Sequence, residues 1–354
     1  MNDSIVIDTP LPYCNICLPS TDPKYQAYNI AVSGILLAFV GVIGFFGNIL
    51  VIRVYTTPNM RKYSSNIYLA ALGTSDLLMI CTAMFLFVLE SWRHHSRPIV
   101  AYIYGFGAPY IFPLGAIFQT TSVYFCVAAA VDCFIHVVLP KKIGDKCCTA
   151  KIAERIVIII TIICFLYNVP HFFELQSVLC IDTKYEINNL QICPTDFRTN
   201  EIYYTIYYTF LYTTFMAVGP LVVLVILNIC VVVSVCSKSN TIVGEDENDE
   251  EDGTISLILV VFFFIFCNFI ALVVNFLELI FQQQLEATMA YLIDMSNLLV
   301  VINCTANFFV YLIFSPAFKR TLKEIIFSNK VIKDEEEIWK ESCENGSSLQ
   351  NIID

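Results

Sequence analysis

The sequence contains a stretch of thirty-three residues, Ile99 to Val131, without a single Asp, Glu, Lys or Arg. About 20 consecutive apolar residues cross the hydrocarbon core of a bilayer, so this stretch predicts a membrane-spanning helix. We expect an outer loop at Gly105-Phe106-Gly107, followed by Pro109 at the helix start, where its missing N–H is no loss. Polar side chains between Gln119 and Tyr124 would be unpaired in lipid, so this helix must face other protein.

Six other apolar stretches give seven predicted spans in all. The chain is 57% hydrophobic and 14% charged, which excludes an ordinary soluble domain or a disordered chain. A short amphipathic helix opens at Ser315-Pro316 and should lie along the inner membrane surface, with Phe318 and Leu322 on one face. The predicted fold is therefore an all-α membrane protein, a seven-helix bundle over residues 28–327, between an outer segment 1–27 and a tail 328–354. The other spans are Lys24–Arg53, Tyr63–Leu89, Ile156–Phe173, Ile202–Cys236, Thr254–Leu277 and Met289–Ile313.

Basic residues near the spans set the orientation. Placing the N-terminus outside leaves five of the twenty Lys and Arg residues outside and fifteen inside, as the positive-inside rule requires. The seven carboxylates within residues 245–252 do not overturn this, because acidic residues contribute little to orientation. We therefore expect a multi-pass plasma-membrane protein with an extracellular N-terminus, where Asn2 of Asn2-Asp3-Ser4 is a candidate glycan acceptor.

Motifs at corresponding positions of several spans resemble those of rhodopsin-like (class A) G-protein-coupled receptors, over Tyr28 to Phe327. Each is weak alone, but their order and spacing together are specific: Asn48, Leu72-Gly73-Thr74-Ser75-Asp76, Pro220, Asn307-Phe308-Phe309-Val310-Tyr311 and Phe318. Closer details resemble invertebrate FMRFamide-type neuropeptide receptors, particularly the nematode sets. These are Pro109 to Leu114, Asn168 to Glu174, Phe266-Cys267-Asn268 and Asn303 to Phe308.

The activation motifs depart from the family pattern. Asp132-Cys133-Phe134 stands in place of the DRY motif, so the arginine that meets the G protein in the family is missing. Cys267-Asn268-Phe269-Ile270 replaces CWxP. We take Asp132, Cys133 and Tyr311 as the activation switch, and these losses predict weak coupling to the G protein.

The family's third-helix disulfide cysteine is also absent, since Ala108 or a neighbour occupies its place. Four cysteines are expected outside, and four allow three pairings. Without a third-helix partner, we predict a bridge from Cys180 to Cys193 inside a hairpin of the second outer loop.

Asp76 lies in the middle of the second span, where a carboxylate is costly unless it is paired or hydrated. By its resemblance to the family, Asp76 with Ser122, Asn303 and Asn307 would form a sodium pocket. The alternative is a structural carboxylate, hydrogen-bonded in a network with Asn48. We expect no other cofactor.

The outer surface is acidic, with a net charge of −7 from twelve acids and five bases, and would attract a cation. An amidated peptide ending in Arg-Phe fits, because Arg pairs with carboxylates in two-pronged geometry and Phe enters an aromatic pocket. For most loop acids a solvated surface is the simpler account. The predicted ligand-binding residues are four acids at helix mouths, Glu90, Glu174, Glu278 and Asp294, and four residues lining the cavity below, Tyr110, Gln119, Tyr212 and Asn297.

These observations predict a receptor for a small cationic peptide, acting on a heterotrimeric G protein, with the lipid bilayer as its solvent and no nucleic-acid partner. A chemosensory receptor for small environmental molecules is the alternative. A channel or transporter is disfavoured by the lack of an inverted repeat or a pair of broken helices. An enzymatic function is not expected. An intramembrane protease is disfavoured in particular, because Asp76 and Asp132 would lie at different depths on separate helices.

Overall fold

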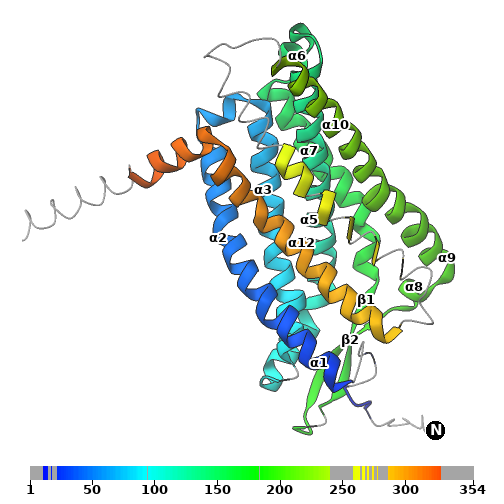
Figure 1. Ribbon diagram of the computed structural model, residues 1–354. Helices are drawn as coiled ribbons and strands as arrows, with labels where there is room; N and C mark the ends of the chain where they lie inside the picture. Colours follow the sequence, from blue (N-terminus) through cyan, green and yellow to red (C-terminus); the bar gives the residue numbers. More distant parts are fainter. Residues whose placement is uncertain are drawn as a thin grey trace, which may run out of the picture.

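The computed structural model describes residues 11–14, 17, 22–93, 95–182, 184–239, 258–263, 265–267, 269–270, 273–274, 277 and 286–327. Within these ranges, six helical segments are long and apolar enough to cross a membrane, and they lie together as a bundle (Figure 1). The remaining predicted span, Thr254–Leu277, is described only in part, and its residues 258–263 and 265–267 are helical. The six segments are Pro23–Tyr55, Ser64–Arg93, Pro98–Val138, Ala150–Phe173, Glu201–Ser237 and Thr288–Phe314.

Several spans combine α-helix with wider π turns or tighter 3-10 turns. The first joins α1 (Pro23–Asn29), η1 (Ile30–Leu36) and α2 (Leu37–Tyr55), and the second α3 (Ser64–Ala83), η3 (Met84–Val88) and α4 (Leu89–Arg93). The third is α5 (Pro98–Val138), and the fourth α7 (Ala150–Asn168) with η4 (Val169–Phe173). The fifth joins α9 (Glu201–Tyr203), η5 (Tyr204–Val218) and α10 (Gly219–Ser239), and the last described span lies in α12 (Glu286–Phe314). Short helices η2 (Met60–Lys62), α6 (Lys141–Cys147) and α8 (Asp196–Thr199) lie in the connections.

Helix α5 lies at the centre, packed against α3, α7 and α10. This confirms the expectation that its polar residues face protein, since Thr120, Thr121 and Ser122 are buried. Helices α2 and α12 also approach closely, because a methyl group at Gly44 would collide with Thr305. Small residues at such contacts let membrane helices pack by van der Waals contact and interhelical hydrogen bonds.

The predicted beginning of the third span was wrong. No loop interrupts it at Gly105: α5 is continuous from Pro98, which occupies the first helical turn, and both Pro109 and Pro113 lie inside the helix. Pro109 has no N–H to donate to the Gly105 carbonyl, and Ser177 of the hairpin donates to that oxygen instead, at 2.6 Å. The glycine is needed for contact, because an added Cβ would lie 2.6 Å from the Leu190 carbonyl oxygen.

Strands β1 (Leu175–Ile181) and β2 (Asn188–Pro194) form the predicted antiparallel hairpin, but the predicted bridge within it is wrong. Cys180 pairs with Cys14 and Cys193 with Cys17. The register explains this, since Cys180 faces Asn189 and Cys193 faces Gln176, so the two hairpin cysteines are not opposite each other. Instead Tyr13 pairs with Ile181 as a parallel bridge, which brings the outer segment beside β1.

The predicted helix after Ser315 is present at residues 316–327. The Ser315 hydroxyl accepts a hydrogen bond from the backbone N–H of Phe318, which caps the helix start. Phe318 is completely buried, with its ring centroid 5.5 Å from that of Tyr55 and 5.8 Å from that of Tyr311. The inner face of this helix is therefore anchored to the bundle by an aromatic cluster.

Candidate functional site

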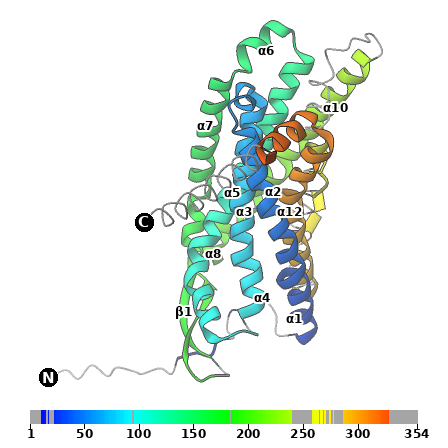
Figure 2. The same ribbon diagram turned by 90° about the vertical axis from the view of Figure 1, so that its left-hand side faces the viewer.

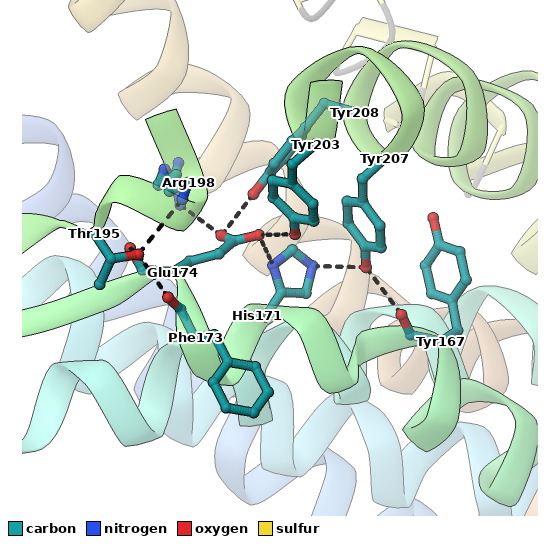
Figure 3. Close-up of polar contacts among 9 residues, drawn as sticks. All are labelled: Tyr167, His171, Phe173, Glu174, Thr195, Arg198, Tyr203, Tyr207 and Tyr208. Atoms are coloured by element: carbon teal, nitrogen blue, oxygen red, sulfur yellow. Dashed lines mark hydrogen bonds and ion pairs between the residues drawn. The ribbon is translucent and has the colours of Figure 1, made fainter. Parts of the chain in front are cut away.

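The end of the bundle that carries the hairpin holds a buried carboxylate, Glu174, between η4 and β1 (Figure 3). Its side chain is completely buried. The Tyr203 hydroxyl donates to its Oε1 at 2.5 Å and the Tyr208 hydroxyl to its Oε2 at 2.7 Å. The Arg198 guanidinium donates to Oε2 at 2.8 Å, and His171 Nδ1 lies 2.9 Å from Oε1. We call these five residues the Glu174 cluster.

The contacts of the cluster continue through His171 into the bundle. Its Nε2 lies 3.2 Å from the Tyr207 hydroxyl oxygen, and that hydroxyl donates to the Tyr167 carbonyl at 3.0 Å. Because the Tyr207 hydroxyl gives its one proton to the Tyr167 carbonyl, it can only accept from His171 Nε2. Burial by itself raises the pKa of a carboxyl group, but hydrogen bonds and charge from His171 and hydrogen bonds from Tyr203 and Tyr208 lower the pKa of Glu174 to about 2.

The other predicted mouth acids have different surroundings. Glu90 Oε1 lies 3.5 Å from an Arg93 guanidinium nitrogen, and that guanidinium also lies over the Tyr104 ring. Asp294 on α12 is buried and accepts a hydrogen bond from the Asn29 side-chain amide at 3.0 Å. Among the described residues, Asp294 forms no ion pair with a lysine, arginine or histidine. Glu278 and the predicted glycan acceptor Asn2 lie outside the described residues.

The four residues predicted to line a cavity are dispersed. Gln119 lines a small cavity in the middle of the bundle, together with Ser122 and Asn303. Tyr110 is 62% exposed, and Tyr212 and Asn297 are half-buried. Of these four, only Gln119 belongs to that cavity.

Two of the partners predicted for Asp76 form hydrogen bonds with it, and all three side chains are buried. Ser122 donates to one oxygen of Asp76 at 2.7 Å and the Asn307 amide donates to the other at 2.7 Å. Asn48 donates to the carbonyls of Gly44 and Cys304 instead of to Asp76. The network therefore links the helices of the first, second, third and last described spans.

The donor set around Asp76 fits a hard cation, which favours carboxylate, carbonyl and hydroxyl oxygens. Ser122 and Asn303 line the small cavity, and the Asn303 side-chain oxygen is buried without a hydrogen-bond partner. That oxygen is available to an ion or to a water molecule. Both interpretations of Asp76 are compatible with these contacts.

At the opposite end of the bundle, Asp132 is held by two hydroxyls from the start of α3. Ser64 and Ser65 both donate to its Oδ2, at 2.8 and 2.7 Å. Cys133 is buried in the core beside it. Tyr311 is also buried, packed edge-on against Tyr55, with no hydrogen-bond partner for its hydroxyl within the described part of the chain. The Asp132 carboxylate is therefore hydrogen-bonded to the start of the second span.

The hydrogen-bond partners of Asp132 and of Glu174 were not predicted from the sequence. Ser64 and Ser65 begin the second span directly after an extended residue, and two adjacent hydroxyls at a helix start were the available signal. For Glu174, the two tyrosines Tyr203 and Tyr208 are five residues apart, which is the hydrogen-bond spacing of the π helix that this segment forms.

Comparison with known proteins identifies the family. The sequence profile described as 7 transmembrane receptor (rhodopsin family) matches residues 47–311. The Probable G-protein coupled receptor frpr-1 of Caenorhabditis elegans is 36% identical over 333 residues, which cover 88% of this chain and 85% of that protein. The FMRFamide receptor of Drosophila melanogaster is 29% identical over 345 residues, covering 95% of this chain and 61% of that protein. The FMRFamide peptide receptor frpr-18 of Caenorhabditis elegans is 30% identical over 297 residues, covering 80% and 67%.

The match to the profile covers most of the chain, and it includes Asp76 with its partners Ser122 and Asn307. The arrangement of apolar helices agrees with a multi-pass bundle. The chain therefore belongs to the rhodopsin family of seven-transmembrane receptors.

Proposed function

We propose that this chain is a plasma-membrane receptor for a short cationic amidated peptide of the FMRFamide kind. The observation that carries the proposal is its similarity, over most of its length, to two proteins named as FMRFamide receptors. The N-terminus lies outside the cell in this proposal. Tags at the two ends should then differ in accessibility before permeabilisation, and equal accessibility would contradict the topology.

Of the three predicted mouth acids that the structure describes, Asp294 is the best suited to receive the cationic side chain of the peptide. The carboxylate of Glu174 is already matched by Arg198 and His171, and Glu90 lies beside Arg93. Asp294 is buried and has an amide partner, Asn29, but forms no ion pair within the described residues. A guanidinium at this carboxylate would form a partly desolvated, charge-assisted pair.

The test is a double-mutant cycle between Asp294→Asn and a peptide whose arginine is replaced by citrulline, its uncharged isostere. If the pair is buried, Asp294→Asn should weaken the arginine peptide by about 2–5 kcal/mol, or about 30-fold or more. The citrulline peptide should bind both receptors equally weakly. Glu201→Gln removes an exposed carboxylate at the same end and is the matched control.

Two results would redirect the proposal. Equal losses for both peptides would show that Asp294 acts on the fold and not on the ligand charge. The chemosensory alternative would be favoured if ligand affinity stayed unchanged when each of the four acids was substituted in turn, Glu90, Glu174, Glu278 and Asp294.

Signalling through a heterotrimeric G protein belongs to the proposal, with weak coupling. Cys133 is short and buried, so it cannot extend to a G protein as an arginine would. Asp132 is restrained by Ser64 and Ser65, and no arginine adjoins it. Cys133→Arg should therefore raise basal or peptide-driven nucleotide exchange, measured at equal surface expression. Strong exchange in the unmodified receptor that the substitution leaves unchanged would contradict weak coupling.

A further inference from the structure

Three side chains that can bind a metal meet at the inner end of the bundle, away from the ligand mouth. They are Asp132 and His136 on α5 and Cys148 between α6 and α7, and their ligand atoms all lie within 4.8 Å of one another. Asp132 and His136 are four residues apart, so they lie on the same face of the helix. Figure 2 shows α6 at the end of the bundle opposite β1.

We propose that Asp132, His136 and Cys148 form a binding site for a zinc ion. A carboxylate oxygen, an imidazole nitrogen and a thiolate sulfur are the three ligand types that zinc takes in proteins. Three protein ligands leave the fourth tetrahedral position for water. The proposal is independent of the peptide ligand, because it concerns the opposite end of the receptor.

The geometry requires only a small contraction. In a tetrahedral zinc site with bonds of about 2.0–2.3 Å, ligand atoms lie about 3.4–3.6 Å apart, so no separation has to close by more than about 1.4 Å. His136 is exposed and Cys148 is half-buried, so both side chains have room to turn. Asp132 is buried and stays fixed, with the other two closing on it.

Surrounding contacts orient two of the ligands. Ser64 and Ser65 both donate to Oδ2 of Asp132, which leaves the other carboxylate oxygen to face the metal. Cys148 ends α6, where its backbone N–H donates to the Gly144 carbonyl at 2.8 Å. Its thiol donates to the Asp132 backbone oxygen at 3.8 Å, which places the sulfur beside α5, and this contact ends when zinc replaces the thiol proton. The hydrogen bonds from Ser64 and Ser65 remain and are of the kind that holds a metal ligand in its binding orientation.

The three side chains can together neutralise a divalent cation, because Asp132 supplies a carboxylate and Cys148 can exchange its thiol proton for a bound metal. A thiolate and a carboxylate in contact repel each other unless a cation lies between them, and zinc replaces the thiol proton on binding. The same connection carries exposed lysines that would repel a cation, Lys141, Lys142 and Lys146. Salt screens exposed charges beyond about 8 Å, which limits this repulsion.

The test uses the full-length receptor in lipid nanodiscs, titrated with zinc against a chromophoric chelator, and with cobalt as a spectroscopic probe. The unmodified receptor should bind one zinc ion at this site. His136→Asn and Cys148→Ser should each weaken that binding by at least about tenfold. Cobalt should give a thiolate-to-metal absorption band that Cys148→Ser removes. Zinc should also raise the unfolding temperature of the unmodified receptor but not of His136→Asn.

The neighbouring thiol provides the matched control. Cys147→Ser removes an exposed cysteine one residue away and should leave zinc affinity and the cobalt band unchanged. His136 is exposed, so its substitution should not prevent folding, which keeps the test interpretable. The proposal is wrong if the unmodified receptor binds no more zinc than His136→Asn, if the cobalt band survives Cys148→Ser, or if Cys147→Ser abolishes binding.

Discussion

Replacing Glu174 with glutamine should destabilise the receptor strongly. Glutamine keeps the shape of the side chain but removes its charge. Its NH2 group would also face a hydroxyl that donates to Glu174, either Tyr203 or Tyr208, so two hydrogen-bond donors would oppose each other. Breaking a buried ion pair by removing one partner costs about 3–5 kcal/mol, because the other charge is left uncompensated. The Arg198 side chain is 36% exposed and can be partly rehydrated, so we expect the lower end, about 3 kcal/mol.

Thermal unfolding of the purified receptor in detergent measures this loss. For large domains each kcal/mol shifts the midpoint by about 2–4 °C, so Glu174→Gln should lower it by about 6–12 °C. Glu154→Gln is the control, since the side chains of Glu154 and its partner Arg61 are 47% and 56% exposed, and such an ion pair should contribute under about 1 kcal/mol. An unchanged midpoint combined with a loss of peptide affinity would refute the reasoning and make Glu174 a ligand contact.

The stability difference between the unmodified receptor and Glu174→Gln should depend on pH, because the pKa of Glu174 is lowered. The group binds protons more weakly in the folded receptor, so its ionised form contributes stability above the ordinary value of 4.5, and that contribution is lost as the pH falls toward about 2. The gap between the unmodified receptor and Glu174→Gln should be constant from pH 8 to about 5 and should narrow below 4.5. A gap that closes already between pH 7 and 6 would show that another group controls it.

Three further changes test other parts of the structure. Cys14→Ser should lower stability by about 2–5 kcal/mol, and non-reduced peptide maps of the unmodified receptor should join Cys14 to Cys180; a bond between the two hairpin cysteines would contradict the fold. Asp76→Asn should alter the sodium dependence of ligand affinity, and identical behaviour at every sodium concentration would make the carboxylate structural only. Gly105→Ala should cost about 1–3 kcal/mol through overlap with the β2 backbone, whereas Gly144→Ala, whose nearest neighbouring atom is 4.0 Å away, should be neutral in thermal unfolding.

Hydropathy and motif spacing predicted the bundle well, because a span must be apolar along its whole length to cross the bilayer. The carboxylate at Asp76 and its partners Ser122 and Asn307 could be predicted for a similar reason. A charge in the middle of a membrane needs polar neighbours at the same depth. The helix beginning after Ser315 was also predictable, since its cap and its apolar face are local in sequence.

The errors arose where long-range contacts replaced local rules. Gly105 and Pro109 read as a helix boundary, but the hairpin supplies the hydrogen bond that the proline cannot. The cysteine pairing depends on an outer strand that lies beside β1, and no spacing in the sequence encodes that neighbour. Glu174 does follow the fourth span, but its partners Arg198 and Tyr208 come from α8 and η5, later in the chain, and reach it only through packing.

The two disulfides of the outer segment can close only after most of the chain has been synthesised. On the proposed topology, Cys14 reaches the oxidising compartment first, while Cys180 follows 166 residues later, after four spans have been made. At about 5–20 residues per second, that interval is roughly 8–33 s. Throughout it, Cys14 and Cys17 have each other as the nearest thiols, and a bond between them would have to be exchanged before either mature bridge could close. Newly made receptor should therefore depend on a disulfide isomerase. Its early chains should contain a disulfide between Cys14 and Cys17 that the mature protein lacks.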